Sequence, residues 1–304
     1  MTNQTSGIIE QHVLKISIVV TLLLAIVGIL FGLLSGSMAI VFDGMFNVVD
    51  TVMSILALLV ARLLTSEGSR RFQYGFWHVE PMVLVFNGII LMLLCAYAFI
   101  NAAGSLLSGG RELNFDWAAV FALLMSVLSI TMYVYIRQKN LKLNSEFLRL
   151  DTHSWLISAF ISSSLLVAFG IATLMEHTQY HDLTIYVDPL ILAVLTACLI
   201  FVPMAAVRDA LRDMFLIAPF SLDKKIREFL DDLVARQGFK TYTSYVAKIG
   251  RAQFIEIHIV LPEGYFISGI ESLDMIRREI RDAVGGESPQ RWLTVAFTAD
   301  ESWI

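Results

Sequence analysis

The sequence predicts a polytopic α-helical membrane protein with six transmembrane helices, followed by a small α+β domain. The chain of 304 residues is 57% hydrophobic and 16% charged, whereas soluble proteins carry about 25% charged residues. Six long apolar runs occupy residues 13–207, and the charges of that region fall mainly at the ends of the runs. Residues 221–304 have the charged composition of an ordinary globular domain, so the chain divides into a membrane part and a soluble part.

Each apolar run is long enough to cross a bilayer as a helix, which takes about 20 mainly apolar residues. A helix is expected because backbone polar groups cannot be left unpaired in hydrocarbon. Residues 1–12 lack the basic start and the small-residue cleavage site of a signal peptide, so we expect the first run to be retained. The helices are predicted at Val13–Leu34, Met38–Leu63, Val79–Leu107, Trp117–Ile136, Phe147–Leu174 and Val187–Val207.

Basic residues predict the orientation of the six helices. Those between the second and third runs and between the fourth and fifth runs are Arg62, Arg70, Arg71, Arg137, Lys139, Lys142 and Arg149. The connections on the opposite side hold Arg111 alone. The positive-inside rule therefore predicts that both termini, residues 1–12 among them, lie in the cytoplasm. For a bacterial chain this means the inner (plasma) membrane, with lipid as the surroundings of residues 13–207.

A linker over residues 208–220 leads to the soluble domain at 221–304. Ser221 is suited to cap a helix that runs to about Arg236 and ends at Gly238, with Asp223 in its first turn. The segments TYTSYVAKI and AQFIEIHIVL predict two strands joined by a turn at Gly250, and the second strand alternates cleanly between polar or aromatic residues and isoleucines.

The remaining elements complete a compact two-layer unit. Ser268 and Glu271 form a capping-box pattern before a helix that ends near Val284. WLTVAFT predicts a third strand, which gives the order α-β-β-α-β.

Several function classes are disfavoured. The net charge of −5 suggests no nucleic-acid partner. The chain contains no nucleophile–base pair, phosphate loop or HExxH motif, so we expect neither an enzyme nor a bound cofactor. Cys95 and Cys198 lie far apart in apolar runs and are expected to be unpaired apolar residues.

Ionisable groups inside the apolar runs indicate where function lies, because a carboxylate in lipid costs at least ~2.5 kcal/mol. Asp43, Asn47 and Asp50 of the second run fall within about 60° of one another on one helix face. Such a stripe suits a cation site or the lining of a water-filled path. The alternative is that Asp43 lies near a helix end while Asp50 pairs with a buried basic residue.

The fifth run carries a second polar face. Asp151, Ser154, Ser158 and Ser162 share it, whereas His153 points about 150° away. The serines are either oxygen ligands or small residues that allow close helix packing. Asp188 precedes a proline at the start of the sixth run, where a structural role in starting the helix is expected.

At this point the sequence resembles the cation diffusion facilitator family of metal exporters, from about His12 onward. SGSMAIVFDGMFNVVD resembles the second helix of that family, YGFWHVEPM the entry to the third, LRLDTHSWLIS the fifth and YVDPL the sixth. FIEIHIVLP resembles a strand of the metallochaperone-like C-terminal domain of the family. The resemblance implies a homodimer in which each protomer exchanges a cytoplasmic divalent metal ion for protons.

The resemblance also implies a site of four ligands on the second and fifth helices. At the four matching positions this chain has Phe46, Asp50, Ser154 and Ser158. We therefore expect a hard, all-oxygen site built from Asp50, Asp43, Asn47, Asp151, Ser154 and Ser158. Such ligands suit Mg²⁺ or Mn²⁺ better than Zn²⁺, and among Mn, Fe, Zn, Co and Mg the sequence does not select one ion.

Two functions are compatible with these residues. The first is metal/proton antiport by alternating access, in which protonation of the carboxylates drives release of the ion. The second, suggested by the replaced ligands, is a non-transporting family member that acts as a scaffold or as a heterodimer partner. The soluble domain has a single histidine, His258, so we do not expect metal to close two such domains together.

Overall fold

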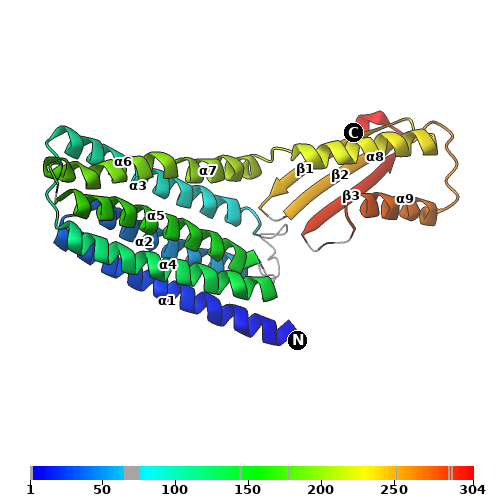
Figure 1. Cartoon of the computed structure of the whole chain (residues 1–304). Coiled ribbons are helices and arrows are strands. Elements are labelled where there is room, and N and C mark those ends of the chain that lie inside the picture. The colour runs from blue at the N-terminus through cyan, green and yellow to red at the C-terminus, as the bar shows by residue number, and fades with distance from the viewer. Residues whose placement is uncertain are drawn as a thin grey trace. The chain divides into compact units, whose positions relative to one another are not determined.

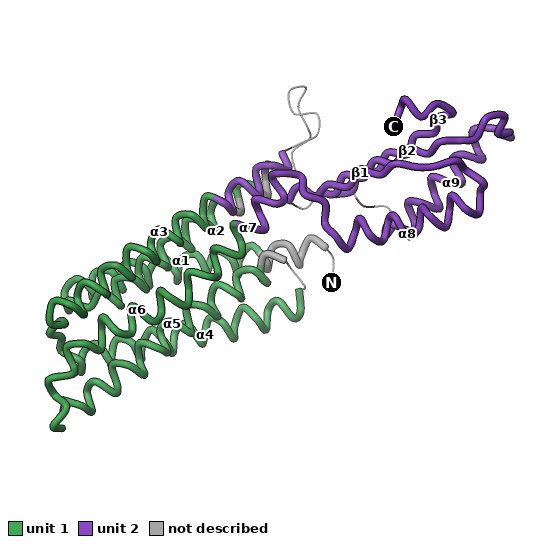
Figure 2. Tube along the Cα trace, turned by 90° about the horizontal axis from the view of Figure 1, so that it is seen from above, with its two compact units in different colours: residues 1–62, 86–207 green, residues 63–85, 208–304 purple. Residues whose placement is uncertain are grey.

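The structure is a computed structural model that describes residues 3–64, 76–143, 146–176, 178–250, 252–286, 288 and 290–304. The chain forms two compact units (Figure 2). The first comprises residues 1–62 and 86–207, and the second comprises residues 63–85 and 208–304.

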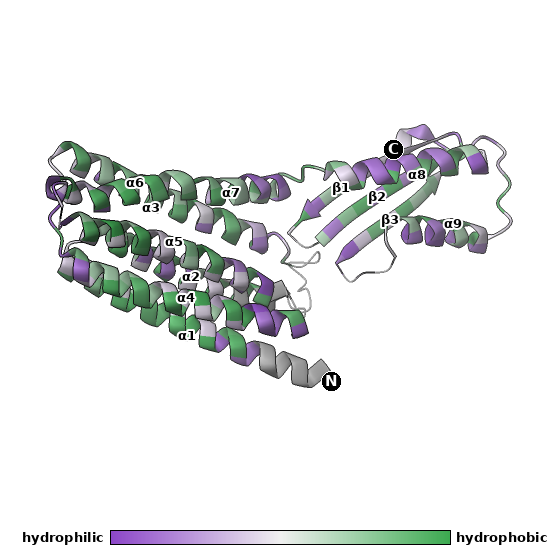
Figure 3. Cartoon of the chain, in the orientation of Figure 1, coloured by the Kyte–Doolittle hydropathy of each residue, from purple (hydrophilic) through white to green (hydrophobic). Residues whose placement is uncertain are grey.

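The first unit is a bundle of long helices (Figure 1). Six segments of the described chain are long and apolar enough to cross a membrane, which confirms the predicted fold class. Hydrophobic residues cover most of the length of these helices (Figure 3). The helices are α1 (Asn3–Ser35), α2 (Met38–Leu64), α3 (Val79–Leu107), α4 (Phe115–Leu143), α5 (Glu146–Glu176), α6 (Val187–Leu199) and α7 (Phe201–Met214), with a short 3₁₀ segment η1 (His181–Tyr186) before α6.

Several helices extend beyond the apolar runs. α1 begins at Asn3 rather than near Val13, and α4 continues to Leu143, so that Arg137, Lys139 and Lys142 lie on helical turns. Arg, Lys, Gln and Leu favour helix outside hydrocarbon as well as inside it, which a prediction from apolar length alone does not include. Arg70 and Arg71 lie outside the described residues.

The sixth span is interrupted once. α6 ends at Leu199 and α7 begins at Phe201, with Ile200 between them. Pro203 lies in the first turn of α7, where its ring crowds the carbonyl of Leu199 and its nitrogen donates no hydrogen bond. The prediction of one continuous helix over residues 187–207 is therefore correct in position and misses this break.

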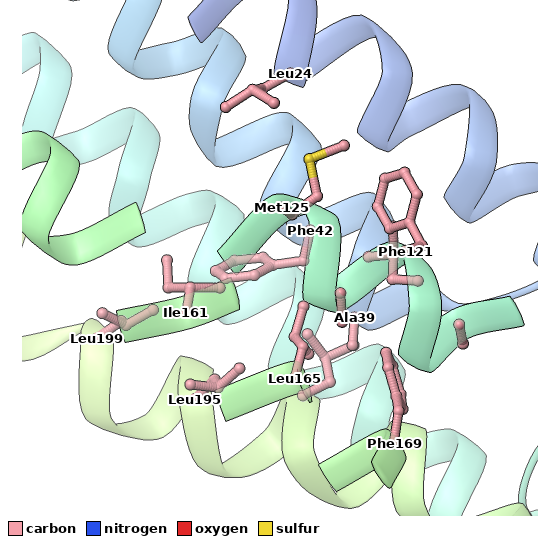
Figure 4. Packing of buried hydrophobic residues seen from close by; sticks show 14 of the residues in the cluster. Leu24, Ala39, Phe42, Phe121, Met125, Ile161, Leu165, Phe169, Leu195 and Leu199 are labelled. Carbon is pink, nitrogen blue, oxygen red and sulfur yellow. The ribbon is translucent and has the colours of Figure 1, made fainter. Parts of the chain in front are cut away.

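The described core of the bundle draws on helices α1 to α6, and Figure 4 shows part of it. Large side chains from α4 and α5 contact residues of α1, α2 and α6, including Leu24, Ala39, Phe42, Phe121, Met125, Ile161, Leu165, Phe169, Leu195 and Leu199. Leucines and isoleucines on the outer faces remain exposed, as expected for helices that face lipid.

Glycines bring α1 and α2 close together. A Cβ added at Gly44 on α2 would lie 2.7 Å from the backbone nitrogen of Ile29, and one at Gly32 on α1 would lie 2.7 Å from that of Val41. Gly28 faces Gly44 in the same contact. Close approach through small residues is the usual way for membrane helices to gain packing contacts.

The second unit contains the predicted α-β-β-α-β domain, which is confirmed. Its elements are α8 (Phe220–Gln237), β1 (Thr241–Ile249), β2 (Ala252–Val260), α9 (Ile270–Ala283), β3 (Arg291–Thr298) and a terminal 3₁₀ turn η2 (Glu301–Trp303). The strand order is β1-β2-β3. β1 and β2 are antiparallel and joined by the turn at Gly250, whereas β3 is parallel to β2 and reached through α9.

The alternation of β2 decides which face of the sheet is covered. Ile255, Ile257 and Ile259 are completely buried and share a core with residues of α8 and α9. Glu256 on the opposite face is exposed. Both helices therefore pack on one face of the sheet, as the period of two in the sequence predicts.

Two predicted helix caps are wrong. α8 begins two residues earlier than expected, with Pro219 at its N-cap, so Ser221 lies inside the first turn and caps nothing. α9 begins one residue later than the capping-box pattern implies, with Gly269 at its N-cap and no side-chain cap. The C-terminal prediction is confirmed, because Gly238 takes the left-handed conformation that ends α8.

Candidate functional site

The polar stripe of α2 faces the serines of α5 inside the bundle. The Ser162 hydroxyl lies 3.4 Å from Oδ2 of Asp43, and the Ser158 hydroxyl lies 3.0 Å from Oδ1 of Asn47. Ser154 hydrogen-bonds to the side chain of Asp50. The residue numbers of these pairs rise along α2 while they fall along α5, as expected for antiparallel neighbouring helices. We call these six residues the α2–α5 polar ladder: Asp43, Asn47, Asp50, Ser154, Ser158 and Ser162.

Burial is deepest in the half of the ladder nearest the start of α2. Asp43 is 5% exposed, and Asn47, Ser158 and Ser162 are buried to the same degree. Asp50 and Ser154 are half-buried. The ladder therefore runs from a closed interior toward a more open end.

The carboxylate of Asp43 is incompletely satisfied. Its Oδ2 faces Ser162, but its Oδ1 is buried and has no hydrogen-bond partner among the described residues. Within the same described chain neither Asp43 nor Asp50 forms an ion pair with a lysine or arginine. The alternative in which Asp50 pairs with a buried basic residue thus finds no support in the described part of the chain. A buried carboxylate without such a partner needs a proton or a bound cation.

Asn47 is held in one orientation. Its amide nitrogen donates to the backbone carbonyl of Asp43 at 2.9 Å, one turn earlier in α2, while its oxygen accepts from Ser158. The amide oxygen is therefore directed toward α5, where it presents a neutral acceptor between the two acidic positions.

Asp151 lies beside the ladder and is held by α1. The Ser17 hydroxyl donates to Oδ1 of Asp151 at 2.9 Å, and Nε1 of Trp155 donates to the same hydroxyl oxygen at 2.7 Å. The second oxygen of Asp151 is buried without a partner in the described structure. Asp50 is near enough for the two negative charges to interact. Asp151 thus adds a carboxylate on the α1 side of the ladder and does not belong to the row of serines that faces α2.

Two residues considered in the sequence analysis lie away from this site. Phe46 packs against Phe42, with ring centroids 6.4 Å apart, and belongs to the apolar core. His153 is exposed on α5, on the side expected from its helical angle. Neither one supplies a ligand to the ladder.

The partners from α1 could not be identified in the sequence. Ser17 and Thr21 are both buried and four residues apart on α1, but such a pair is also typical of simple helix packing. Nothing in the sequence indicates that Ser17 faces Asp151, 134 residues away.

Every polar group of the site that points inward is an oxygen or an amide. The described residues contain no cluster of three or more His, Cys, Asp or Glu side chains placed to hold a metal ion. Carboxylate, amide and hydroxyl oxygens are hard ligands, which suit Mg²⁺ or Mn²⁺ and suit Zn²⁺ poorly. A hydrated ion held by few protein oxygens is compatible with this arrangement.

Comparisons with known proteins agree with this description. The family model for the cation efflux transmembrane domain matches residues 14–215. The chain is 29% identical over 139 residues to the manganese efflux system protein MneP of Bacillus subtilis (strain 168), which is 45% of this chain and 46% of the relative. It is 25% identical over 167 residues to the manganese efflux system protein MneS of the same organism, or 55% of this chain and 57% of the relative. The chain thus spans about half the length of the curated relatives it matches.

Proposed function

We propose that this chain, which belongs to the cation efflux family of cation diffusion facilitators, exports a divalent metal ion in exchange for protons through the α2–α5 polar ladder. The observation that carries the proposal is the carboxylate of Asp43. It is buried, it has one oxygen without a partner in the described structure, and it shares a helix face with Asn47 and Asp50. Evolution tolerates such a costly group inside a membrane chiefly where it serves transport.

Mn²⁺ is the substrate that the site fits best. The ladder offers only oxygen atoms from side chains, and Mn²⁺ accepts carboxylate, carbonyl and water ligands. The two relatives described above are both named as manganese efflux proteins. Fe²⁺, Co²⁺ and Zn²⁺ depend more on imidazole or thiolate ligands, and the ladder contains neither.

We propose proton coupling because the ladder contains no basic residue that could neutralise its carboxylates. The same carboxylate oxygens of Asp43 and Asp50 accept either a metal ion or protons, and repulsion between Asp50 and the nearby Asp151 favours occupancy by one or the other. Metal bound from the cytoplasm is then displaced when protons arrive from the opposite side. Asn47, which does not titrate, keeps one ligand constant in both states.

Orientation and assembly complete the proposal. Arg137, Lys139 and Lys142 extend from the end of α4, and we assign that end to the cytoplasm by the positive-inside rule. Both termini then lie in the cytoplasm. We expect the working form to be a homodimer in a plasma membrane, as in the family that the chain belongs to.

Transport in reconstituted vesicles tests the proposal directly. Purified protein in liposomes that contain a pH-sensitive dye is challenged in turn with Mn²⁺, Fe²⁺, Co²⁺, Zn²⁺, Cd²⁺ and Mg²⁺. We expect proton movement with Mn²⁺ that is lost in Asp50→Ala. The matched control is Asp116→Ala, which removes an exposed carboxylate from the first turn of α4 and is expected to keep transport.

Two results would contradict the proposal. Transport that persists in folded Asp50→Ala would exclude this site. If folded and inserted protein shows no proton movement with any of the ions, the result would favour the scaffold or heterodimer role that the replaced ligands suggest.

A further inference from the structure

A second buried acid, Asp188, lies outside the ladder and joins three parts of the bundle. These parts are the α1–α2 connection at residues 36–37, the α3–α4 connection at residues 108–114, and the start of α6. We call this end of the bundle, where α6 begins, the distal end, and it lies at the left in Figure 1. Asp188 is completely buried in the first turn of α6, next to Pro189. The sequence pattern Asp188-Pro189 indicates only a role at the start of its own helix.

The carboxylate of Asp188 caps a different helix, α2. It accepts the Ser37 hydroxyl at 2.5 Å and the backbone N–H groups of Met38 and Ala39, each at 3.3 Å. Ser37 in turn accepts the N–H of Ile40 at 3.2 Å. The free N–H groups at the start of α2 are thereby satisfied, and the negative charge lies at the positive end of the helix dipole.

Arg111 of the α3–α4 connection completes the cluster. Its Nη1 lies 3.6 Å from Oδ2 of Asp188, its Nη2 donates to Asn101 at 3.1 Å, and its backbone N–H donates to Ile185 at 2.7 Å. The Arg111 side chain is 24% exposed, whereas that of Asp188 is 0% exposed. Arg111 is therefore the part of the cluster that solvent reaches.

We propose that Asp188 is a positioning residue which, with Ser37 and Arg111, forms a latch that closes the distal end of the bundle and fixes the start of α2. Asp43 follows Met38 by five residues, which is about 7.5 Å along the helix. A change in the first turn of α2 therefore moves the deepest acid of the ladder. The role in transport rests on the proposed function, but the closure itself is a property of the bundle.

The physical reason for a latch is the cost of opening it. Separating α2 from α6 leaves a buried carboxylate and several backbone N–H groups without partners unless water enters. Opening is thus coupled to hydration of the distal end, and the closed arrangement excludes water from Asp43 while the latch is intact.

Cysteine labelling tests the latch without any metal ion. Ala39→Cys places a thiol at a completely buried position beside the latch, and Ala25→Cys places one at a completely buried position in the middle of α1. Both are built in a chain without Cys95 and Cys198, and the purified protein in detergent reacts with a membrane-impermeant maleimide. Glu112→Cys in the exposed α3–α4 connection measures full accessibility.

Loss of the latch is expected to expose position 39 alone. Asp188→Ala should raise the labelling rate at position 39 about fivefold, because the loss of a helix cap of roughly 1 kcal/mol changes an equilibrium by about that factor. Asp188→Asn, which keeps an acceptor for Ser37 but loses the charge, should fall between Asp188→Ala and the parent. Arg111→Gln, which leaves the cap intact, should have a smaller effect than either.

Two outcomes would overturn the latch. One is an unchanged labelling rate at position 39 in Asp188→Ala. The other is an equal rise at positions 25 and 39 in both Asp188 variants, which would make Asp188 a general stabiliser of the bundle. Neither outcome depends on transport, so a protein that moves no ion still decides the question.

Discussion

The hydroxyl of Ser158 donates a hydrogen bond of 3.0 Å to the amide oxygen of Asn47. The two residues come from different helices and are 111 positions apart in the chain. Because both side chains are buried, this contact and the bond from the Asn47 amide nitrogen to Asp43 fix the direction of the amide. It follows that the geometry of the ladder depends on a neutral pair as much as on the two acids.

Ser158→Ala is expected to weaken both stability and transport. The change leaves the oxygen of Asn47 without a donor in a buried place, which typically costs about 1–3 kcal/mol. Ser164→Ala is the matched control, since the Ser164 hydroxyl is exposed and bonds within α5 to Phe160. Thermal unfolding in detergent and metal-driven proton flux measure the two effects. Equal behaviour of the two variants would contradict the assigned role of Ser158.

Asp43→Asn is expected to reduce transport strongly while the protein stays folded. Asparagine keeps the size of the side chain and an acceptor for Ser162 but removes the charge that a cation needs. Loss of one charge-assisted contact of about 1.5–3 kcal/mol weakens binding roughly 10- to 150-fold. The dependence of proton flux on Mn²⁺ concentration measures this change. An unaltered half-saturating concentration would place the ion elsewhere, at Asp50 and Asp151 alone.

The sequence predicts which face of each helix is polar but not every partner of that face. A rotation of 100° per residue is enough to group Asp43, Asn47 and Asp50, and the structure places them on one side of α2. The contact of Ser17 with Asp151 depends on how α1 packs against α5, and a periodic pattern within one helix contains no information on that. The role of Asp188 is hidden for the same reason, because it caps α2 from the start of α6.

In the second unit the strands are predicted better than the helix starts. Alternation along β2 depends only on the period of two and on burial, and it survives intact. A helix cap depends on the backbone angles of a single residue. Pro219 and Gly269 take the cap positions in place of Ser221 and Ser268, although serine is the stronger capping residue in general.

Trp155→Phe is expected to loosen α1 from α5. The change removes the indole N–H that donates to Ser17 and leaves a small void, because Trp155 is 3% exposed. We expect a loss of about 1–3 kcal/mol from the missing hydrogen bond and the void. Trp117→Phe, at a position 66% exposed, should change stability by less than about 0.5 kcal/mol. Thermal unfolding of both variants in detergent decides between these expectations.

Tyr242 on β1 is expected to titrate later than an ordinary tyrosine. Burial, and then the hydrogen bond of 2.7 Å to Asp231, raise the pKa of Tyr242 to about 12. Since the pKa is higher in the folded state than in the unfolded chain, the associated stability is present below about pH 10. It is lost as the pH rises toward about 12.

The difference in tyrosinate absorbance between the parent and Tyr242→Phe isolates this group from the other tyrosines. Titration of the difference near pH 10 would mean that the contact with Asp231 does not persist in solution. Asp231→Asn should lower the pKa of Tyr242 toward its usual value, because it removes the negative charge beside the hydroxyl.

Gly44→Ala is expected to disrupt the contact between α1 and α2 and, through it, the ladder. The added methyl group would lie 2.7 Å from the backbone nitrogen of Ile29 and 3.1 Å from the carbonyl oxygen of Ala25, so the backbones must separate. Overpacking of this kind costs about 1–3 kcal/mol or more. Gly104→Ala on α3 is the matched control, since nothing lies within 4 Å of its added methyl group, and alanine there should stabilise the helix by about 0.5–1 kcal/mol. Thermal unfolding in detergent should therefore shift in opposite directions for the two variants, and an upward shift of similar size in both would show that α1 and α2 do not meet at Gly44.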